Sequence, residues 1–388
     1  MSVTARVREQ SAELSGAVAD LGVLVPIAAA LVLRSGFDAA TLLVGVGALY
    51  LLAGLYFRVP VPVQPIKAAA AIAISRELAP EVLAAAGVIL GGVLLVLGAS
   101  GASGLIVRLF AKPVVRGLQL GVGLILVKSA WTLGGDASAG LLLVAAVVVV
   151  LLAAGSGSRR PVALAVVAGG VLWSLIREGG IGPVDLALWH PEWQRRAFDR
   201  DVLMSALTLL VIPQIPLTFG NAVVALADLE HHYYGARARR VTPRAVSLSC
   251  GVANVAIGSL GGMPMCHGSG GLTAHHRAGA RTNAMNAWIG GTLLAGGLFL
   301  GPVAFEVLAL IPLPVLMGLL AFTGLAHSGL VRDLRGYPLA VAVVAGVAGA
   351  WAANLAVTLV IGLACHWVPR LVSAVRGLPA PGARDPAR

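Results

Sequence analysis

The chain has 388 residues, of which 58% are hydrophobic and only 12% are charged. This apolar content is well above that of a soluble domain, and apolar runs of membrane-spanning length recur from end to end. The sequence therefore predicts an all-α polytopic protein embedded in a lipid bilayer. The net charge of +11 does not indicate nucleic-acid binding, because the basic residues lie between apolar runs and form no stripe with aromatic residues.

The apolar runs predict about fourteen membrane spans, seven in each half of the chain. The first seven are residues 17–33, 40–57, 60–75, 82–98, 113–133, 139–155 and 161–177. The second seven are residues 203–227, 243–259, 263–276, 285–303, 306–325, 338–351 and 354–371. The halves correspond to residues 1–185 and 195–375, and a short tail follows at 376–388. Because an odd number of spans turns the second half over in the membrane, the count predicts an inverted-topology repeat.

The distribution of basic residues predicts the orientation of these spans. Most of the 28 Lys and Arg residues fall on the segments that share one side with the N-terminus. By the positive-inside rule that side is cytoplasmic. We therefore expect both termini and the loop at 235–240 to be cytoplasmic, the loop at 189–200 to be external, and the protein to reside in the plasma (inner) membrane.

Two predicted spans begin with residues that an ordinary membrane helix avoids. Residues 59–75 read VPVPVQPIKAAAAIAIS, and residues 261–281 read GGMPMCHGSGGLTAHHRAGAR. Each pattern predicts a helix that is broken at the depth of the bilayer, where irregular backbone persists only if it is buried in protein or lines a cavity. Paired broken helices at matching places in two halves of a chain indicate the binding site of a transporter.

The first broken helix has features that favour an anion. Pro65 precedes a good helix-forming run, and the unpaired N–H groups at a helix start carry partial positive charge. Lys67 adds a full positive charge in the first turn, a placement that is unfavourable unless an anion or a carboxylate such as Asp20 lies nearby. Gln64 could bind substrate or link helices.

The second broken helix offers further donors. Gly268 and Gly270 would allow backbone amides to approach an oxyanion closely, Ser269 supplies a hydroxyl, and His267 supplies a ring N–H. The alternative for the glycines is close helix packing, which is common in membrane proteins. Together the two helix starts predict a site for an oxyanion.

Several intramembrane polar residues have two possible roles. Thr218 and Asn221, together with Gln214, could bind substrate or join helices, and Asp20 could carry a proton or cap the first helix. Lys128 is expected to reach toward the interface. The histidines and cysteines match no accepted metal-ligand spacing, so we expect no metal and no cofactor. No catalytic dyad is visible, so we expect no enzyme.

These segments resemble those of a known family. The stretches ELSGAVADLGVLVPIAAAL, VPVPVQPIKAAAAIAIS, IPQIPLTFGNAVVA and GGMPMCHGSGGLTAHHRAGAR are similar to segments of the molybdate transporter family, a branch of the sulfate permease superfamily. The resemblance spans nearly the whole chain. It implies seven plus seven inverted spans, a core domain of spans 1–4 and 8–11, a gate domain of the rest, and an anion near residues 64–67 and 267–270.

Two departures from the superfamily bear on this resemblance. The sulfate permeases usually carry a cytoplasmic regulatory domain after the last span, and the short tail here fits the molybdate branch instead. Family members often have an aromatic residue where His276 stands.

The expected function is import of molybdate by a secondary active transporter, with sulfate as the nearest rival substrate and tungstate preference open. No Walker-type loop is present, which disfavours direct ATP coupling. A dianion must enter against an inside-negative potential, so proton symport is expected, with Asp20 or His267 as the carrier. The alternatives are an anion channel and a nucleobase symporter on the same fold. A homodimer is an open alternative for the assembly.

Overall fold

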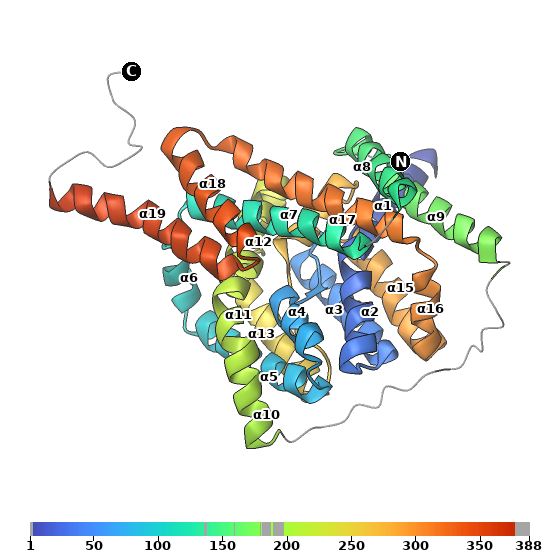
Figure 1. The fold of residues 1–388 in the computed structure, drawn as a ribbon, viewed down its shortest axis with the longest axis horizontal. Helices are drawn as coiled ribbons and strands as arrows, with labels where there is room; N and C mark the ends of the chain where they lie inside the picture. The colour runs from blue at the N-terminus through green and yellow to red at the C-terminus, as the bar shows by residue number, and fades with distance from the viewer. Residues whose placement is uncertain are drawn as a thin grey trace.

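The computed structural model describes residues 3–135, 138–158, 160–178, 180, 188 and 198–376. Within these ranges the regular secondary structure is helical apart from one pair of two-residue strands. The predicted tail beyond residue 376 and most of the predicted external loop at 189–200 lie outside the described residues. Figure 1 shows the arrangement of the helices.

The first half contains α1 Val3–Ala19, α2 Leu21–Ser35, α3 Ala39–Phe57, β1 Gln64–Pro65, α4 Lys67–Arg76, α5 Pro80–Ala99, α6 Ala102–Val107, α7 Lys112–Gly134, α8 Ala139–Gly155 and α9 Val162–Glu178. The second half begins with α10 Arg200–Ser205, the π-helix η1 Ala206–Val211, α11 Ile212–Leu217, the π-helix η2 Thr218–Val224, α12 Ala225–Tyr234 and η3 Gly235–Ala238. It continues with α13 Pro243–Ser259, β2 Met265–Cys266, α14 Ser269–Arg277, α15 Ala284–Leu300, η4 Gly301–Val303, α16 Ala304–Ala309, α17 Leu313–Ser328, η5 Gly329–Asp333, α18 Gly336–Trp351 and α19 Leu355–Val375.

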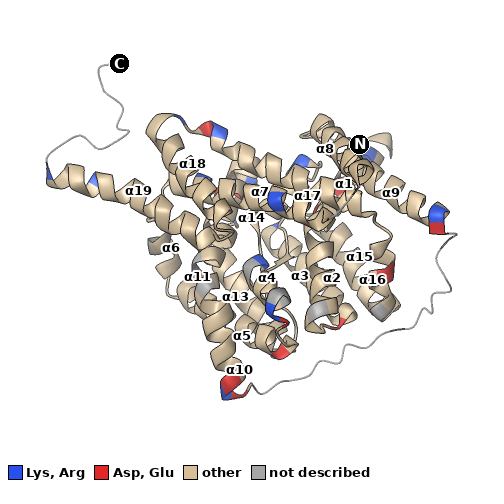
Figure 2. Ribbon diagram, in the orientation of Figure 1, with Lys and Arg blue, Asp and Glu red and all other residues tan. Residues whose placement is uncertain are grey.

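The prediction of an all-α polytopic membrane protein is confirmed. Six helical segments in the described part of the chain are long and apolar enough to cross a bilayer: Thr4–Leu33, Ala39–Phe57, Pro80–Ala99, Lys112–Gly134, Leu313–Asp333 and Leu355–Val375. Three shorter apolar helices accompany them: Ala139–Gly155, Ala284–Leu300 and Gly336–Trp351. Charged residues are sparse over most of the ribbon (Figure 2).

Three predicted span boundaries were wrong. The first helix begins at residue 3 rather than 17, because the polar residues before the apolar run are good helix formers. The span at 203–227 is broken into α-helical and π-helical turns, since Pro213 and Pro216 supply no backbone N–H. The span at 306–325 is two helices, α16 and α17, separated at Pro312, which opens α17 as its N-cap residue.

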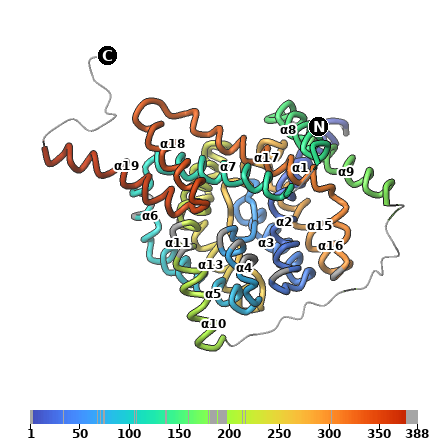
Figure 3. Tube along the Cα trace, viewed as in Figure 1, coloured from blue at the N-terminus to red at the C-terminus, as the bar shows by residue number. Residues whose placement is uncertain are grey.

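The helices form two groups. α3 packs against α15 and α5 against α13, while α7 packs against α17 and α18, and α17 also packs against α8. In Figures 1 and 3 the helices α7, α17, α18 and α19 lie along the upper side, and α2 to α5, α13 and α15 lie below them. Small residues permit the close contacts: a Cβ on Gly91 would lie 2.8 Å from the Gly251 carbonyl oxygen, and a Cβ on Gly290 would lie 2.9 Å from that of Gly47.

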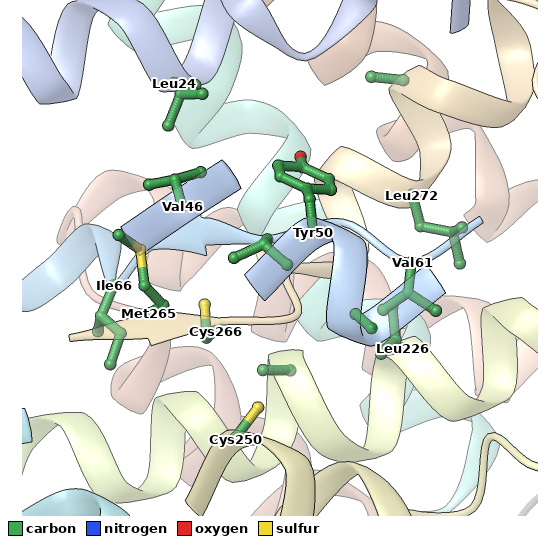
Figure 4. Packing of buried hydrophobic residues seen from close by; sticks show 14 of the residues in the cluster. Leu24, Val46, Tyr50, Val61, Ile66, Leu226, Cys250, Met265, Cys266 and Leu272 are labelled. Carbon is green, nitrogen blue, oxygen red and sulfur yellow. The ribbon is translucent and has the colours of Figure 1, made fainter. Parts of the chain in front are cut away.

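The two broken helices meet at the short strand pair. β1 and β2 run antiparallel with Gln64 opposite Cys266 and Pro65 opposite Met265. The Ile66 N–H donates to the Pro264 carbonyl at 3.2 Å, and Figure 4 shows Ile66 near Met265 in the buried core. Because each strand is followed at once by a helix, α4 and α14 begin side by side in the middle of the protein.

Candidate functional site

A cavity of about 610 Å³ lies between the two groups of helices. Most of its wall is apolar and comes from α2, α4, α7, α17 and the turn before α19. Its polar lining residues are Lys67, Ser129, Thr132, Gln214, Thr218, Asn221, Cys266 and Asn354. Lys67 is the one charged residue among the described lining residues, and no carboxylate is among them. The cavity is therefore suited to a negatively charged solute.

Lys67 lies in the first turn of α4, as predicted, and its Nζ donates to Gln64 Oε1 at 2.7 Å. Gln64 in turn donates through Nε2 to Asp20 Oδ1. The direct ion pair between Lys67 and Asp20 considered from the sequence is thus wrong, because the Gln64 amide stands between them. The lysine charge and the α4 helix dipole both remain directed to the cavity.

Asp20 is fully buried at the break between α1 and α2. Its side chain makes no N-cap hydrogen bond, so the capping role is wrong. Instead Oδ2 accepts from the Tyr50 hydroxyl at 3.0 Å and lies 3.8 Å from His275 Nε2. Its position in this network, behind Gln64, is outside the cavity lining.

Tyr50 and His275 were missed from the sequence. His275 Nδ1 lies 2.8 Å from the Gly16 carbonyl, so that nitrogen carries the proton, and its Nε2 lies 3.3 Å from the Tyr50 hydroxyl. Tyr50 is a single tyrosine in an apolar helix, and the adjacent pair His275–His276 matches no ligand or catalytic spacing, so neither position could be identified from the sequence.

His267 does not reach the cavity. Its Nδ1 lies 2.8 Å from the Pro62 carbonyl, its Nε2 lies 3.0 Å from Ser249 Oγ, and its ring packs edge-on to Phe57. Both nitrogens therefore have protein partners. These contacts count against the expectation that His267 donates to the anion or carries the coupled proton.

Ser269 opens α14 but turns its hydroxyl toward the protein. Its Oγ donates to Asn221 Oδ1 at 2.6 Å and lies 3.2 Å from His327 Nε2. None of the described lining residues belongs to α14, so this helix acts on the cavity through Asn221 of η2, whose side chain the Ser269 hydroxyl orients.

Gln214, Thr218 and Asn221 lie where both of their predicted roles remain open. All three line the cavity. Gln214 also accepts from the Ala69 N–H at 3.2 Å, capping α4, and donates to Thr218 Oγ1 at 2.9 Å. The consecutive segments α11 and η2 therefore bring polar groups to the start of α4.

The glycines and Pro65 shape the helix starts. A Cβ on Gly268 would lie 2.7 Å from Gln64 Oε1 and 3.4 Å from Lys67 Nζ. A Cβ on Gly270 would lie 3.3 Å from Leu126, which lines the cavity. Pro65 occupies β1 opposite Met265. The glycines thus make room for the Lys67 and Gln64 side chains as well as for close backbone approach.

Among the described residues, no group of three His, Cys, Asp or Glu side chains is placed to hold a metal ion. The chemistry of the cavity is that of an ammonium group, amides and hydroxyls.

Comparison with solved structures identifies the fold. The transmembrane domain of the cyanobacterial bicarbonate transporter BicA superposes with a TM-score of 0.57 at 18% identity, covering 91% of this chain and 96% of that one. SLC26A9 superposes with a TM-score of 0.53 at 14% identity, covering 92% of this chain and 64% of that one. The fold is therefore that of an SLC26-type transmembrane domain.

Comparison of sequences identifies the family. Residues 12–126 and 206–326 match the family described as "Molybdate transporter of MFS superfamily". "Molybdate transporter 2" and "Molybdate transporter 1" of Arabidopsis thaliana are 31% and 32% identical to this chain; each alignment covers 84% of it and 80% and 81% of theirs. "Molybdate transporter 1" of Chlamydomonas reinhardtii is 28% identical over 83% of this chain and 84% of that protein. The chain belongs to the molybdate transporter family, a family of integral membrane transporters and not of enzymes.

Proposed function

We propose that this protein imports molybdate as a secondary active transporter and binds the anion in the cavity beside Lys67. The observation that carries the proposal is one cavity with a lysine ammonium in the first turn of α4 and with no carboxylate among its described lining residues. Such a site favours a small dianion. The names of the relatives support molybdate as that dianion.

Sulfate is the alternative substrate, since it has the same charge and shape. The largely apolar wall favours molybdate, because transfer of an ion out of water costs less when its charge is spread over a larger volume. Discrimination then depends on cavity size and on how well Gln214, Thr218 and Asn221 reach the oxygens.

The transport cycle follows from two inverted repeats, residues 1–185 and 195–375, each with seven spans. Matched elements support the repeat: Lys67 opens α4 and Ser269 opens α14 at the same sequence spacing that separates Gln64 from Cys266. Packing supports it as well, since the pair α3 with α15 becomes α13 with α5 when the halves are exchanged. We assign the core to α1 through α5 and α10 through α16, and the gate to α7 through α9 and α17 through α19.

The cavity lies where these two groups meet, which suits alternating access by movement of the core against the gate. We place both termini in the cytoplasm, as the charge distribution indicates, and the protein in the plasma membrane. Entry of a dianion opposes the membrane potential by about 2.3 kcal/mol per charge per 100 mV, which favours coupling to protons. A channel with the same cavity would instead conduct a measurable anion current.

The test compares two lysine variants in proteoliposomes. Lys67→Gln should lower uptake of labelled molybdate at least about tenfold, the loss expected when one charged donor worth roughly 1.5–3 kcal/mol is removed. Lys128→Gln is the matched control, because Lys128 is exposed on α7 and does not line the cavity. Equal uptake by the two variants, at equal protein levels, would place the anion elsewhere. Competition by sulfate in the same assay ranks the two substrates.

A further inference from the structure

One histidine forms hydrogen bonds that join the two groups of helices. His327 of α17 is fully buried, and its ring lies between two hydroxyls of α14: Ser269 Oγ is 3.2 Å from Nε2 and Thr273 Oγ1 is 2.7 Å from Nδ1. Ser269 and Thr273 are four residues apart and therefore face the same side of α14. No sequence motif predicted a role for His327.

The hydrogen bonds fix which nitrogen of the neutral ring carries the proton. The single Ser269 hydroxyl proton is donated to Asn221 Oδ1 at 2.6 Å, so Ser269 can only accept from His327 Nε2–H. The Nδ1 lone pair then accepts from the Thr273 hydroxyl at 2.7 Å. In this arrangement the neutral ring is fully satisfied.

The same surroundings also satisfy the protonated ring. Thr273 Oγ1 lies 3.3 Å from the Ser269 carbonyl, a second acceptor already in place. When Nδ1 takes up a proton, the Thr273 hydroxyl can turn to that carbonyl and accept from Nδ1–H. Only one hydroxyl rotates, so both forms of His327 are hydrogen-bonded without a movement of the backbone.

The network continues on both sides of the ring. Toward the cavity it ends at Asn221, a lining residue. Away from the cavity, the Tyr233 hydroxyl lies 3.4 Å from Thr273 Oγ1, and the Tyr233 ring stacks on His276 with centroids 3.9 Å apart. A chain of hydrogen-bonded side chains therefore runs from Tyr233 of α12 through His327 to Asn221 at the cavity.

The charges that act on His327 link it to the anion. The cations whose charges act on this buried ring are Lys67 of α4 and Arg116 of α7, and Arg116 is paired with Asp228 of α12 and Asp333 of η5. Lys67 makes its hydrogen bond to the neutral Gln64 amide. A protonated His327 would be repelled by Lys67, and a dianion bound beside Lys67 would remove that repulsion.

We propose that His327 is the proton-binding site that couples proton transport to transport of the oxyanion, an inference that rests on the proposed function. The proton is taken up from water onto Nδ1, is held there while the anion is bound, and returns to water on the other side of the membrane when the anion leaves. Since coupling is reciprocal, each ligand strengthens binding of the other. His267 lacks this link, because neither of its partners lines the cavity.

The test measures molybdate affinity between pH 6 and 8.5 for the purified full chain and for His327→Gln. The unmodified protein should bind more tightly as pH falls, by up to about tenfold per pH unit for one coupled proton. His327→Gln should bind molybdate at pH 8.5 within about threefold of the unmodified protein and lose the pH dependence. Its uptake should no longer be driven by a proton gradient, although exchange of molybdate for molybdate continues. His366→Gln, on α19 outside the cavity lining, is the control.

A second variant tests the proposal if His327→Gln does not fold. Thr273→Val keeps the shape but removes the hydroxyl that serves both ring forms, so proton uptake on molybdate addition, followed with a pH indicator in weak buffer, should fall below half of that of the unmodified protein. An unchanged pH dependence in either variant overturns the assignment of His327 alone. Absence of molybdate binding by the unmodified protein at every pH overturns the proposed function instead.

Discussion

The helices α4 and α14 begin from the same strand pair but present different groups. α4 begins with a lysine whose ammonium donates to Gln64. Gln64 donates to Asp20, which also accepts from Tyr50 of α3. α14 begins with glycines and a serine, and its hydroxyls contact His327 of α17. The hydrogen bonds at the start of α4 thus remain within one group of helices. Those that Ser269 and Thr273 make to His327 join α14 to the other group.

This difference separates two tasks that the proposed transport mechanism requires. The fixed positive charge belongs to the half-helix whose partners belong to the same group of helices, so the charge keeps its position relative to the cavity wall. The hydrogen bonds from Ser269 and Thr273 of α14 to His327 cross the interface, so they must change when the groups move. Variants at each helix start can therefore test whether α4 and α14 differ in this way.

The largest effect is expected for Gly268→Ala, where the two starts touch. The new methyl would lie 2.7 Å from Gln64 Oε1, which is held by Lys67, so it should displace the lysine and abolish measurable molybdate and sulfate binding in calorimetric titrations. Gly92→Ala on α5 is the control, since nothing lies within 4 Å of its Cβ. Normal binding by a folded Gly268→Ala protein would show that the starts do not share one site.

Tyr50→Phe tests the α4 side alone. It removes the hydroxyl that donates to buried Asp20 at 3.0 Å, which should destabilise the protein by about 1–3 kcal/mol and lower its midpoint of thermal unfolding. Tyr56→Phe is the matched control, because Tyr56 is exposed. A similar loss in both variants would mean that the Asp20 network contributes no more than a surface tyrosine.

The sequence predicted these two starts well because their signals are local. Pro65 and Gly268 mark the starts of the two helices. The observed starts, Lys67 and Ser269, lie inside the predicted spans 60–75 and 263–276. The partners could not be predicted, since Tyr50 and His275 are separated by 225 positions and Thr273 and His327 by 54. The π-helical turns of η1 and η2 were also missed, because a hydrophobicity pattern does not distinguish them from α-helix.

Ser269→Ala tests the α14 side with a smaller change. Loss of the hydroxyl frees Asn221, whose amide can then turn relative to the cavity. We expect the preference for molybdate over sulfate to shift by roughly tenfold, equivalent to about 1.4 kcal/mol. Ser247→Ala is the control, since that hydroxyl bonds only to the Pro243 carbonyl of its own helix at 2.8 Å. An unchanged preference would assign selectivity to other lining residues.

The smallest effect is expected behind α14, where a second buried carboxyl contrasts with Asp20. Glu230 of α12 is fully buried, and neither of its oxygens has a hydrogen-bond partner among the described residues. Burial raises the pKa of Glu230 well above its usual range, so the folded protein keeps a proton that the unfolded chain loses near pH 4–5. The stability contributed at this position must therefore fall as pH rises above that range.

Glu230→Gln removes this pH-dependent cost because an amide does not ionise. Its midpoint of thermal unfolding should equal that of the unmodified protein near pH 5 and exceed it by a few degrees at pH 8, as measured by scanning calorimetry in detergent. Asp20→Asn should show no such gain, because the Asp20 carboxylate accepts from Gln64 and Tyr50 and would lose those bonds. Parallel pH curves for Glu230→Gln and the unmodified protein would indicate that Glu230 finds a partner that stabilises its charged form. The two buried carboxyls would then differ in position but not in chemistry.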